Sequence, residues 1–242
     1  MKFHYGLNNK KKIDITKIVL SKCVKNNIIT IPKNDVVRKN LFCIDPLPHI
    51  VKNIYINNMK FGPNEEIVID LTKKICICFY GLLRSLKFTI NSIHNNILRD
   101  LINNKYYIDI YLHTYDLKVI NNKRSHEVNV KLNTNDYKLL EPDFVKITSQ
   151  SLFDSKININ DYLIKGDPWP ENPKISLLNL LRQLNSLKII TNMHSDKKYL
   201  LYLYLRPDLK YLNKLDINII KNYKPNEFYT PIWGKFGGLN DR

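Results

Sequence analysis

Ile75-Cys-Ile-Cys-Phe-Tyr80, followed at once by Gly81, is the stretch that decides the fold. Six consecutive apolar residues closed by a glycine are typical of a strand that is buried on both faces, as at the centre of a parallel sheet. Beyond the glycine, apolar residues recur at helical spacing and predict a helix over residues 84–103: Leu86, Ile90, Ile93, Ile97, Leu98 and Leu101. A buried strand that leads directly into a helix favours an α/β fold.

The alternation of strands and helices continues toward the C-terminus. Residues 106–113 and 144–147 are predicted to be strands, and residues 173–193 a helix that is opened by a proline. Residues 197–205 form a further apolar run, which stops abruptly at Arg206-Pro207-Asp208. We therefore expect an α/β domain with a Rossmann-like open sheet and flanking helices.

The first 62 residues differ in character from the rest of the chain. Short β-rich runs at 13–19, 27–31 and 50–57 are broken by prolines and asparagine pairs. A turn-rich joint follows around Gly62 and Pro63. The sequence therefore predicts a small, mostly β module over residues 1–62 and an α/β domain over residues 63–242.

The net charge of +16 raises the question of nucleic-acid binding, because clustered Lys and Arg bind phosphate chains. The lysines are instead scattered among Asn, Ile and Tyr, which is typical of an AT-rich genome, and the densest basic run is only Lys10–Lys12. We do not expect a nucleic-acid partner, although a basic surface would attract nucleotide phosphates. No apolar window is long enough for a membrane span and no secretory signal is present, so we expect a soluble, intracellular protein.

The four cysteines show no recognisable metal-binding pattern. Cys76 and Cys78 lie two apart on the predicted strand, so both point to the same face and cannot easily form a disulfide. We interpret all four as small buried residues in a reducing compartment and assign them no function.

Ligands of open α/β sheets bind beyond the carboxyl ends of the strands, so the residues at these positions are the candidates for a site. After the first strand, Gly81 permits close backbone approach, the helix that begins near Ser85 offers unpaired N–H groups, and Arg84 suits a diphosphate. Neither a GxGxxG fingerprint nor a P-loop is present. These residues predict a site for an anionic ligand.

Charged residues also follow two later strands. Asp116 could accept hydrogen bonds from a ribose or base, or could cap a turn, whereas His113 is expected to pack within the sheet. Asp208 could bind a divalent metal, or could pair with Arg206. Both alternatives stay open for Asp116 and for Asp208.

Five blocks taken together resemble a family of glycosyltransferases found in bacterial surface-polysaccharide loci and in giant DNA viruses. The blocks keep the family's order and span residues 75–242: Cys78-Phe-Tyr-Gly-Leu-Leu-Arg-Ser85, Ile108-Asp-Ile-Tyr-Leu-His-Thr-Tyr-Asp116, Leu178-Asn-Leu-Leu-Arg-Gln-Leu-Asn-Ser-Leu187, Leu205-Arg-Pro-Asp-Leu209 and Gly237-Gly-Leu-Asn-Asp-Arg242. The resemblance implies a GT-A-like domain that binds a nucleotide-sugar donor. Residues 1–62 are similar to a short accessory module of giant-virus proteins.

The resemblance also implies a reaction, in which a sugar passes from a nucleotide-diphosphate donor to a glycan or glycoprotein acceptor. Asp208 would bind a divalent Mn or Mg ion, and Asp241 would act as the base toward the acceptor hydroxyl. Gly81, Arg84, Ser85, Asp116 and Arg206 would bind the donor. The protein would work in a host-cell cytoplasm or in a virion.

Two departures from the family pattern support an alternative function. One aspartate stands at Arg206-Pro207-Asp208 in place of an Asp-x-Asp motif, and the chain ends at Arg242, where the family's domain normally continues. A C-terminally shortened domain is therefore expected. The alternative is a non-catalytic, glycosyltransferase-like binding protein.

Overall fold

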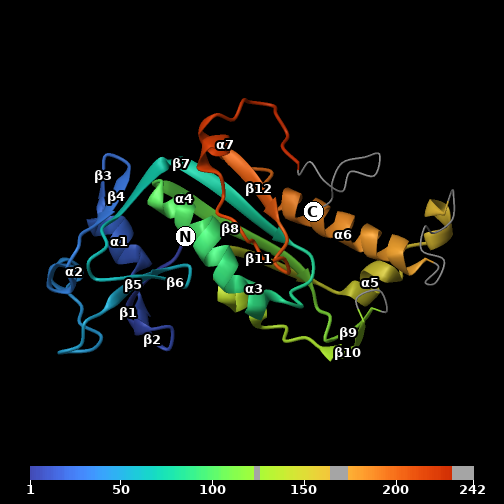
Figure 1. The fold of residues 1–242 in the computed structure, drawn as a ribbon, viewed down its shortest axis with the longest axis horizontal. Helices are drawn as coiled ribbons and strands as arrows, with labels where there is room; N and C mark the ends of the chain where they lie inside the picture. The colour runs from blue at the N-terminus through green and yellow to red at the C-terminus, as the bar shows by residue number, and fades with distance from the viewer. Residues whose placement is uncertain (123–125, 164–173, 231–242) are drawn as a thin grey trace.

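A mixed sheet of six strands forms the centre of the molecule, in a computed structural model that describes residues 1–122, 126–163 and 174–230 (Figure 1). Its strands are β3 (Val24–Lys25), β4 (Ile28–Ile31), β7 (Ile67–Tyr80), β8 (Tyr106–Tyr115), β11 (Phe144–Thr148) and β12 (Leu201–Leu205). The α/β class predicted from the sequence is confirmed.

The second half of β7 lies in a four-stranded parallel array. β8 pairs with one side of β7 and β12 with the other, while β11 extends the array beyond β8. The spatial order is thus β11-β8-β7-β12, or 3-2-1-4 in order along the chain. This order is shared with doubly wound nucleotide-binding sheets, in which the direction of winding reverses beside the first strand.

Helices cover both faces of this array. One face carries α3 (Leu86–Ile93), the π-helical stretch η1 (His94–Leu98) and α4 (Arg99–Asn103), and the other carries α6 (Ile175–Asn192). The alternating side chains of β7 divide between them, with Ile75, Ile77 and Phe79 in the large apolar core and Cys76, Cys78 and Tyr80 in a smaller cluster beside α6. The helices predicted over 84–103 and 173–193 therefore both form.

The strand β7 is longer than expected. The sequence predicted a strand over residues 75–80, but β7 is one 14-residue strand that begins at Ile67, and its pairing with β8 shifts register between Asp70 and Lys74. The first half pairs with β4 in the antiparallel direction. The N-terminal residues are thereby joined to the central sheet, and their apolar side chains share one continuous core with the α/β domain.

The N-terminal residues also form a four-stranded antiparallel sheet in the order β2-β1-β5-β6. Its strands are β1 (Phe3–Asn8), β2 (Lys11–Asp14), β5 (Asn53–Ile56) and β6 (Met59–Phe61). Two helices, α1 (Thr16–Lys22) and α2 (Asp35–Phe42), accompany it. The strand predicted over residues 13–19 forms only at Ile13 and Asp14, which end β2. Asp14 then accepts from the Thr16 N–H at 2.8 Å, and from Thr16 onward the chain is helical and buries Val19.

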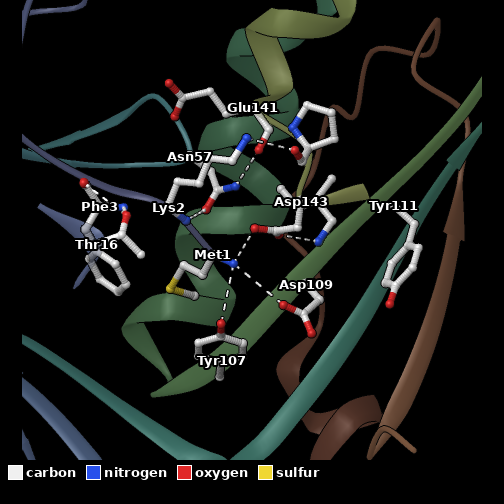
Figure 2. A network of polar contacts seen from close by, with 12 residues as sticks. Met1, Lys2, Phe3, Thr16, Asn57, Tyr107, Asp109, Tyr111, Glu141 and Asp143 are labelled. Carbon is white, nitrogen blue, oxygen red and sulfur yellow. Dashed lines mark hydrogen bonds and ion pairs between the residues drawn. The ribbon is translucent and has the colours of Figure 1, made fainter. Parts of the chain in front are cut away.

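Backbone and side-chain hydrogen bonds attach this N-terminal sheet to the segment before β11 (Figure 2). Asn57 donates to the Glu141 carbonyl at 2.9 Å, and the Lys2 ammonium donates to the Pro142 carbonyl at 3.0 Å. The Met1 amino group lies against the Asp143 carboxylate and is 3.6 Å from Asp109 on β8. The first strand is thus fixed to the sheet by charge as well as by apolar packing.

The remaining described elements surround the sheet: β9 (Val119–Asn122), β10 (Glu127–Lys131), η3 (Asp136–Leu140), α5 (Gln150–Asp154), η4 (Ile159–Tyr162) and α7 (Ile217–Lys221). β9 and β10 form a hairpin beyond β8, and η3 packs against α3. Within the described residues, no helix combines the length and apolarity needed to cross a bilayer.

Candidate ligand-binding site

A cavity of about 150 Å³ opens at the carboxyl ends of β7, β8 and β11. Its apolar wall comes from residues after β7 and β8 and from β11: Leu82, Leu83, Leu117 and Ile147. Its polar wall comes from the start of α3 and the turn before it, and from the end of β10 and the segment after it: Arg84, Lys87, Lys131, Asn133, Thr134 and Asp136. Arg84 is also paired with carboxylates outside the cavity, so the excess positive charge of the lining, which favours an anionic ligand, comes from Lys87 and Lys131 against Asp136.

Two arginines and two carboxylates form a cluster beside this cavity. Arg84 donates through Nε to Asp208 Oδ2 at 3.0 Å and through Nη1 to Glu127 Oε2 at 2.9 Å. Arg206 binds Asp208 with a two-pronged contact of 3.0 and 2.9 Å. The side chain of Asp208 is only 3% exposed, whereas both arginines are partly open to solvent. The carboxylate therefore orients two guanidinium groups at the edge of the sheet.

The cluster brings together residues that the sequence assigned to one site. Arg84 follows β7 and Arg206 follows β12, and the two strands lie side by side where the winding reverses. The Thr89 hydroxyl on α3 donates to the Pro207 carbonyl at 2.6 Å and fixes the turn that carries Asp208. This convergence follows from the 3-2-1-4 strand order, which places the ends of β7 and β12 side by side, whereas the direct pairing of Arg84 with Asp208 could not be read from the sequence.

Gly81 has a positive φ of 103°, and among the described residues no atom lies within 4 Å of the position that a Cβ would take. A side chain would therefore be strained by the backbone and not by crowding, and the space in front of this glycine is open. Its N–H donates to Ser186 Oγ on α6 at 3.0 Å, so this donor is not directed at a ligand. Ser85 is the N-cap of α3, without a side-chain capping bond.

The buried side chain of His113 connects α6 to the end of β11 next to this edge of the sheet. Its ring hydrogen-bonds Ser186 Oγ at 2.6 Å through Nδ1 and Thr148 Oγ1 at 3.0 Å through Nε2. Burial, with a smaller contribution from Lys146, lowers the pKa of His113 to about 4. The expectation that His113 packs within the sheet is confirmed, and it holds α6 and β11 in place as a neutral ring.

Asp116 lies at the end of β8 but outside the charged cluster. It is exposed, and its Oδ1 accepts from the Gln150 N–H at the start of α5 at 3.2 Å. This contact is made to the start of α5 and not to the turn that follows β8, so both the turn-capping alternative and a role toward a ribose stay predictions. Asp241, the predicted base, lies outside the described residues.

The residues around Asp208 do not fit a bound Mn or Mg ion. Both carboxylate oxygens already accept hydrogen bonds from guanidinium groups, and a cation at that position would face two positive charges. The geometry agrees with the alternative that Asp208 pairs with Arg206. Asp208 in this arrangement is therefore a partner of two arginines and not a metal ligand.

A different group of side chains could hold a metal. Cys76, Cys78 and His194 are buried, and one ligand atom from each lies within 4.8 Å of the other two. The two cysteines do point to the same face, as predicted. No sequence pattern indicated that His194 lies beside them, because it follows α6 more than 100 residues later. The interpretation of these two cysteines as plain core residues is therefore incomplete.

Several residues of the cavity were missed by the sequence analysis. Lys87 is the second residue of α3, and its place at the start of the helix that follows Gly81 was a usable signal that it borders the same edge. Glu127, Lys131 and Asn133 lie in polar segments without periodicity, so no pattern could have identified them.

No family model, curated protein or solved structure matched the chain. Its function must therefore be inferred from the residues themselves and from the arrangement of the sheet.

Proposed function

We propose that the chain is a glycosyltransferase that binds a nucleotide-diphosphate sugar at the carboxyl edge of its parallel sheet. The observation that carries this proposal is the basic cavity at the carboxyl ends of β7, β8 and β11, whose Arg84 also belongs to the charged cluster at the ends of β7 and β12, where the winding of the sheet reverses. Doubly wound sheets bind nucleotides at this point. The resemblance of the sequence to glycosyltransferases supports the same ligand class.

The size of the cavity suggests which part of the donor it takes. At about 150 Å³ it is smaller than the roughly 300 Å³ at which pockets for whole small molecules begin. We propose that it takes one end of the donor and that the diphosphate lies across Arg84 at its rim. The apolar wall, which includes Leu83 and Leu117, would pack against a base or sugar ring.

The proposed catalysis is electrostatic. As the glycosidic bond breaks, negative charge develops on the leaving nucleoside diphosphate, and fixed cations close to it lower the barrier. Arg84 and Arg206 would supply this charge, because Asp208 holds them in fixed orientations. Asp241 would take the proton of the acceptor hydroxyl on a glycan or glycoprotein. On the resemblance, this reaction would take place in a host-cell cytoplasm or in a giant-virus particle.

The alternative is a protein that binds the donor without turnover. The arginine pairing of Asp208 favours it, since a glycosyltransferase of the metal-dependent kind needs a carboxylate that is open to the ion. The two functions share the binding site and differ only in whether the sugar is transferred.

Binding and turnover can be measured separately. Thermal shifts with UDP, GDP and CDP, each with and without manganese, would identify the base, and nucleotide release from the matching sugar donors would report turnover. We expect binding to weaken about tenfold in Lys87→Ala, which removes one cation from the cavity. Lys188→Ala, an exposed lysine on α6 outside the cavity, is the matched control.

Turnover without manganese supports the glycosyltransferase, and binding without turnover supports the alternative. Lack of binding by any nucleotide, or equal binding by Lys87→Ala and the wild type, contradicts both.

A further inference from the structure

The face of the sheet that α6 covers contains a group of buried side chains that the proposed reaction does not use. Cys76 and Cys78 come from β7, and His194 comes from the turn after α6. All three are metal ligands by residue type, and they come from separate elements that meet only in the folded chain. We propose that Cys76, Cys78 and His194 form a structural zinc site.

The spacing of the sulfurs suits this ion. Alternation along β7 places both cysteines on one face, and their sulfur atoms lie 3.4 Å apart. Tetrahedral zinc with Zn–S bonds of about 2.3 Å holds two sulfurs about 3.8 Å apart, so an outward shift of a few tenths of an ångström admits the ion. A disulfide would need a separation of about 2.05 Å and a different path of the strand.

An oxygen for the fourth position lies beside the group. The Tyr204 hydroxyl hydrogen-bonds His194 Nε2 at 3.0 Å and Thr191 Oγ1 at 3.2 Å. Tyr204 is the direct neighbour of Cys78 in the pairing of β12 with β7. This hydroxyl, or a water in its place, would complete four ligands.

Aromatic rings fix the orientation of the imidazole. The His194 ring lies 4.9 Å from the Tyr202 ring and 5.7 Å from the Tyr111 ring, between centroids. Packing of this kind holds a ligand in position before the metal arrives, which raises affinity.

The charges of the site balance. Zn²⁺ with two thiolates and one neutral imidazole has no net charge, so the filled site can be buried without an unpaired ion. Binding displaces one proton from each of the two thiols, and both protons pass to solvent. No electron is transferred. The soft thiolates disfavour Mg²⁺ and Mn²⁺ here, which separates this site from the metal that the resemblance implies at Asp208.

The position of the site defines its role. The ion would tie the end of α6 to β7 and β12, behind the edge where the cavity opens. It would therefore stabilise the face of the sheet on which α6 packs, whether or not the chain transfers a sugar.

The test is metal content of the full chain, purified under reducing conditions without a metal-affinity resin and then dialysed against limited zinc. We expect about one zinc per chain in the wild type and less than about a tenth of that in Cys76→Ser and Cys78→Ser. His194→Gln, which keeps both thiols, should bind at least tenfold more weakly. Cys23→Ser, another buried thiol outside the group, is the matched control and should keep its zinc.

Cobalt substitution of the wild type gives a readout that does not depend on variants folding. Tetrahedral cobalt with two thiolates should give intense visible bands and a sulfur-to-cobalt band in the near ultraviolet, and removal of the metal should lower the melting temperature. Wild-type protein without zinc, zinc retained by both cysteine variants, or a cobalt spectrum without thiolate bands overturns the proposal.

Discussion

The two faces of β7 differ in chemistry although they alternate along one strand. The face toward α3 carries Ile75, Ile77 and Phe79, which are fully buried among apolar side chains. The face toward α6 carries Cys76 and Cys78. The neighbouring positions on β8 and β12 add the imidazole of one histidine and the hydroxyl groups of tyrosines. The apolar face provides cohesion, whereas the polar face holds groups that need specific partners.

The residues on the two faces should therefore contribute to the protein in different ways. Substitutions toward α3 should act through lost packing, and those toward α6 and the carboxyl edge should act through lost hydrogen bonds and charges. The predictions that follow test this division.

The largest effect is expected on the apolar face. Ile77→Ala should lower the free energy of unfolding by about 3 kcal/mol, because it leaves a cavity between β7 and α3. Cys78→Ala on the other face, measured with a chelator present, should cost about 1 kcal/mol, since it removes a smaller group. Urea unfolding of both variants measures the difference, and equal losses would show that the two faces pack alike.

The contribution of His113 to the free energy of unfolding should depend on pH. The pKa of His113 is lowered to about 4 in the folded protein, against about 6.5 when unfolded, so between these values the unfolded chain binds more protons. Its contribution to stability is complete above pH 6.5 and is lost as the pH falls toward 4, by up to about 3 kcal/mol.

The free energy of unfolding of the wild type and of His113→Gln, measured between pH 7 and pH 4, isolates this contribution. Because glutamine does not titrate, the variant should lose less stability than the wild type over this range. Parallel curves for the two proteins would mean that folding does not lower the pKa of His113.

A smaller loss of stability, with a change in binding, is expected for Asp208→Asn. The amide keeps the shape but not the charge, so the unfolding free energy should fall by about 1–2 kcal/mol. Arg84 and Arg206 then lose their counter-charge, and the affinity for a nucleotide diphosphate should rise. If Asp208 instead binds a metal ion, the variant should bind the nucleotide diphosphate more weakly than the wild type, and manganese should no longer affect this binding. Isothermal titration of both proteins distinguishes the two outcomes.

The sequence predicted the class of the fold because long apolar runs and helical spacing are local signals. It identified the strands of the parallel array and both long helices, but it missed α1, where β-branched residues such as Ile18 and Val19 favoured a strand. It also assigned Arg84, Arg206 and Asp208 to one site, since the ends of parallel strands meet.

Partners that depend on the register between strands could not be predicted. The pairing of Tyr204 with Cys78 and the arrival of His194 beside them follow from tertiary packing that no local pattern encodes. Likewise, the pairing of Glu127 with Arg84 depends on the fold of a polar hairpin. The sequence left open whether Asp208 binds a metal or pairs with arginine. The fold places two guanidinium groups, those of Arg84 and Arg206, against this one carboxylate, and this favours the pairing.

The most direct test of the central claim is hydrogen exchange of the full chain with and without the nucleotide diphosphate that gives the largest thermal shift. A donor site at the carboxyl edge predicts slower exchange in residues 82–87 and 131–136, which line the cavity, and little change in residues 1–62. Slower exchange confined to residues 1–62, or none in either cavity segment, would contradict it.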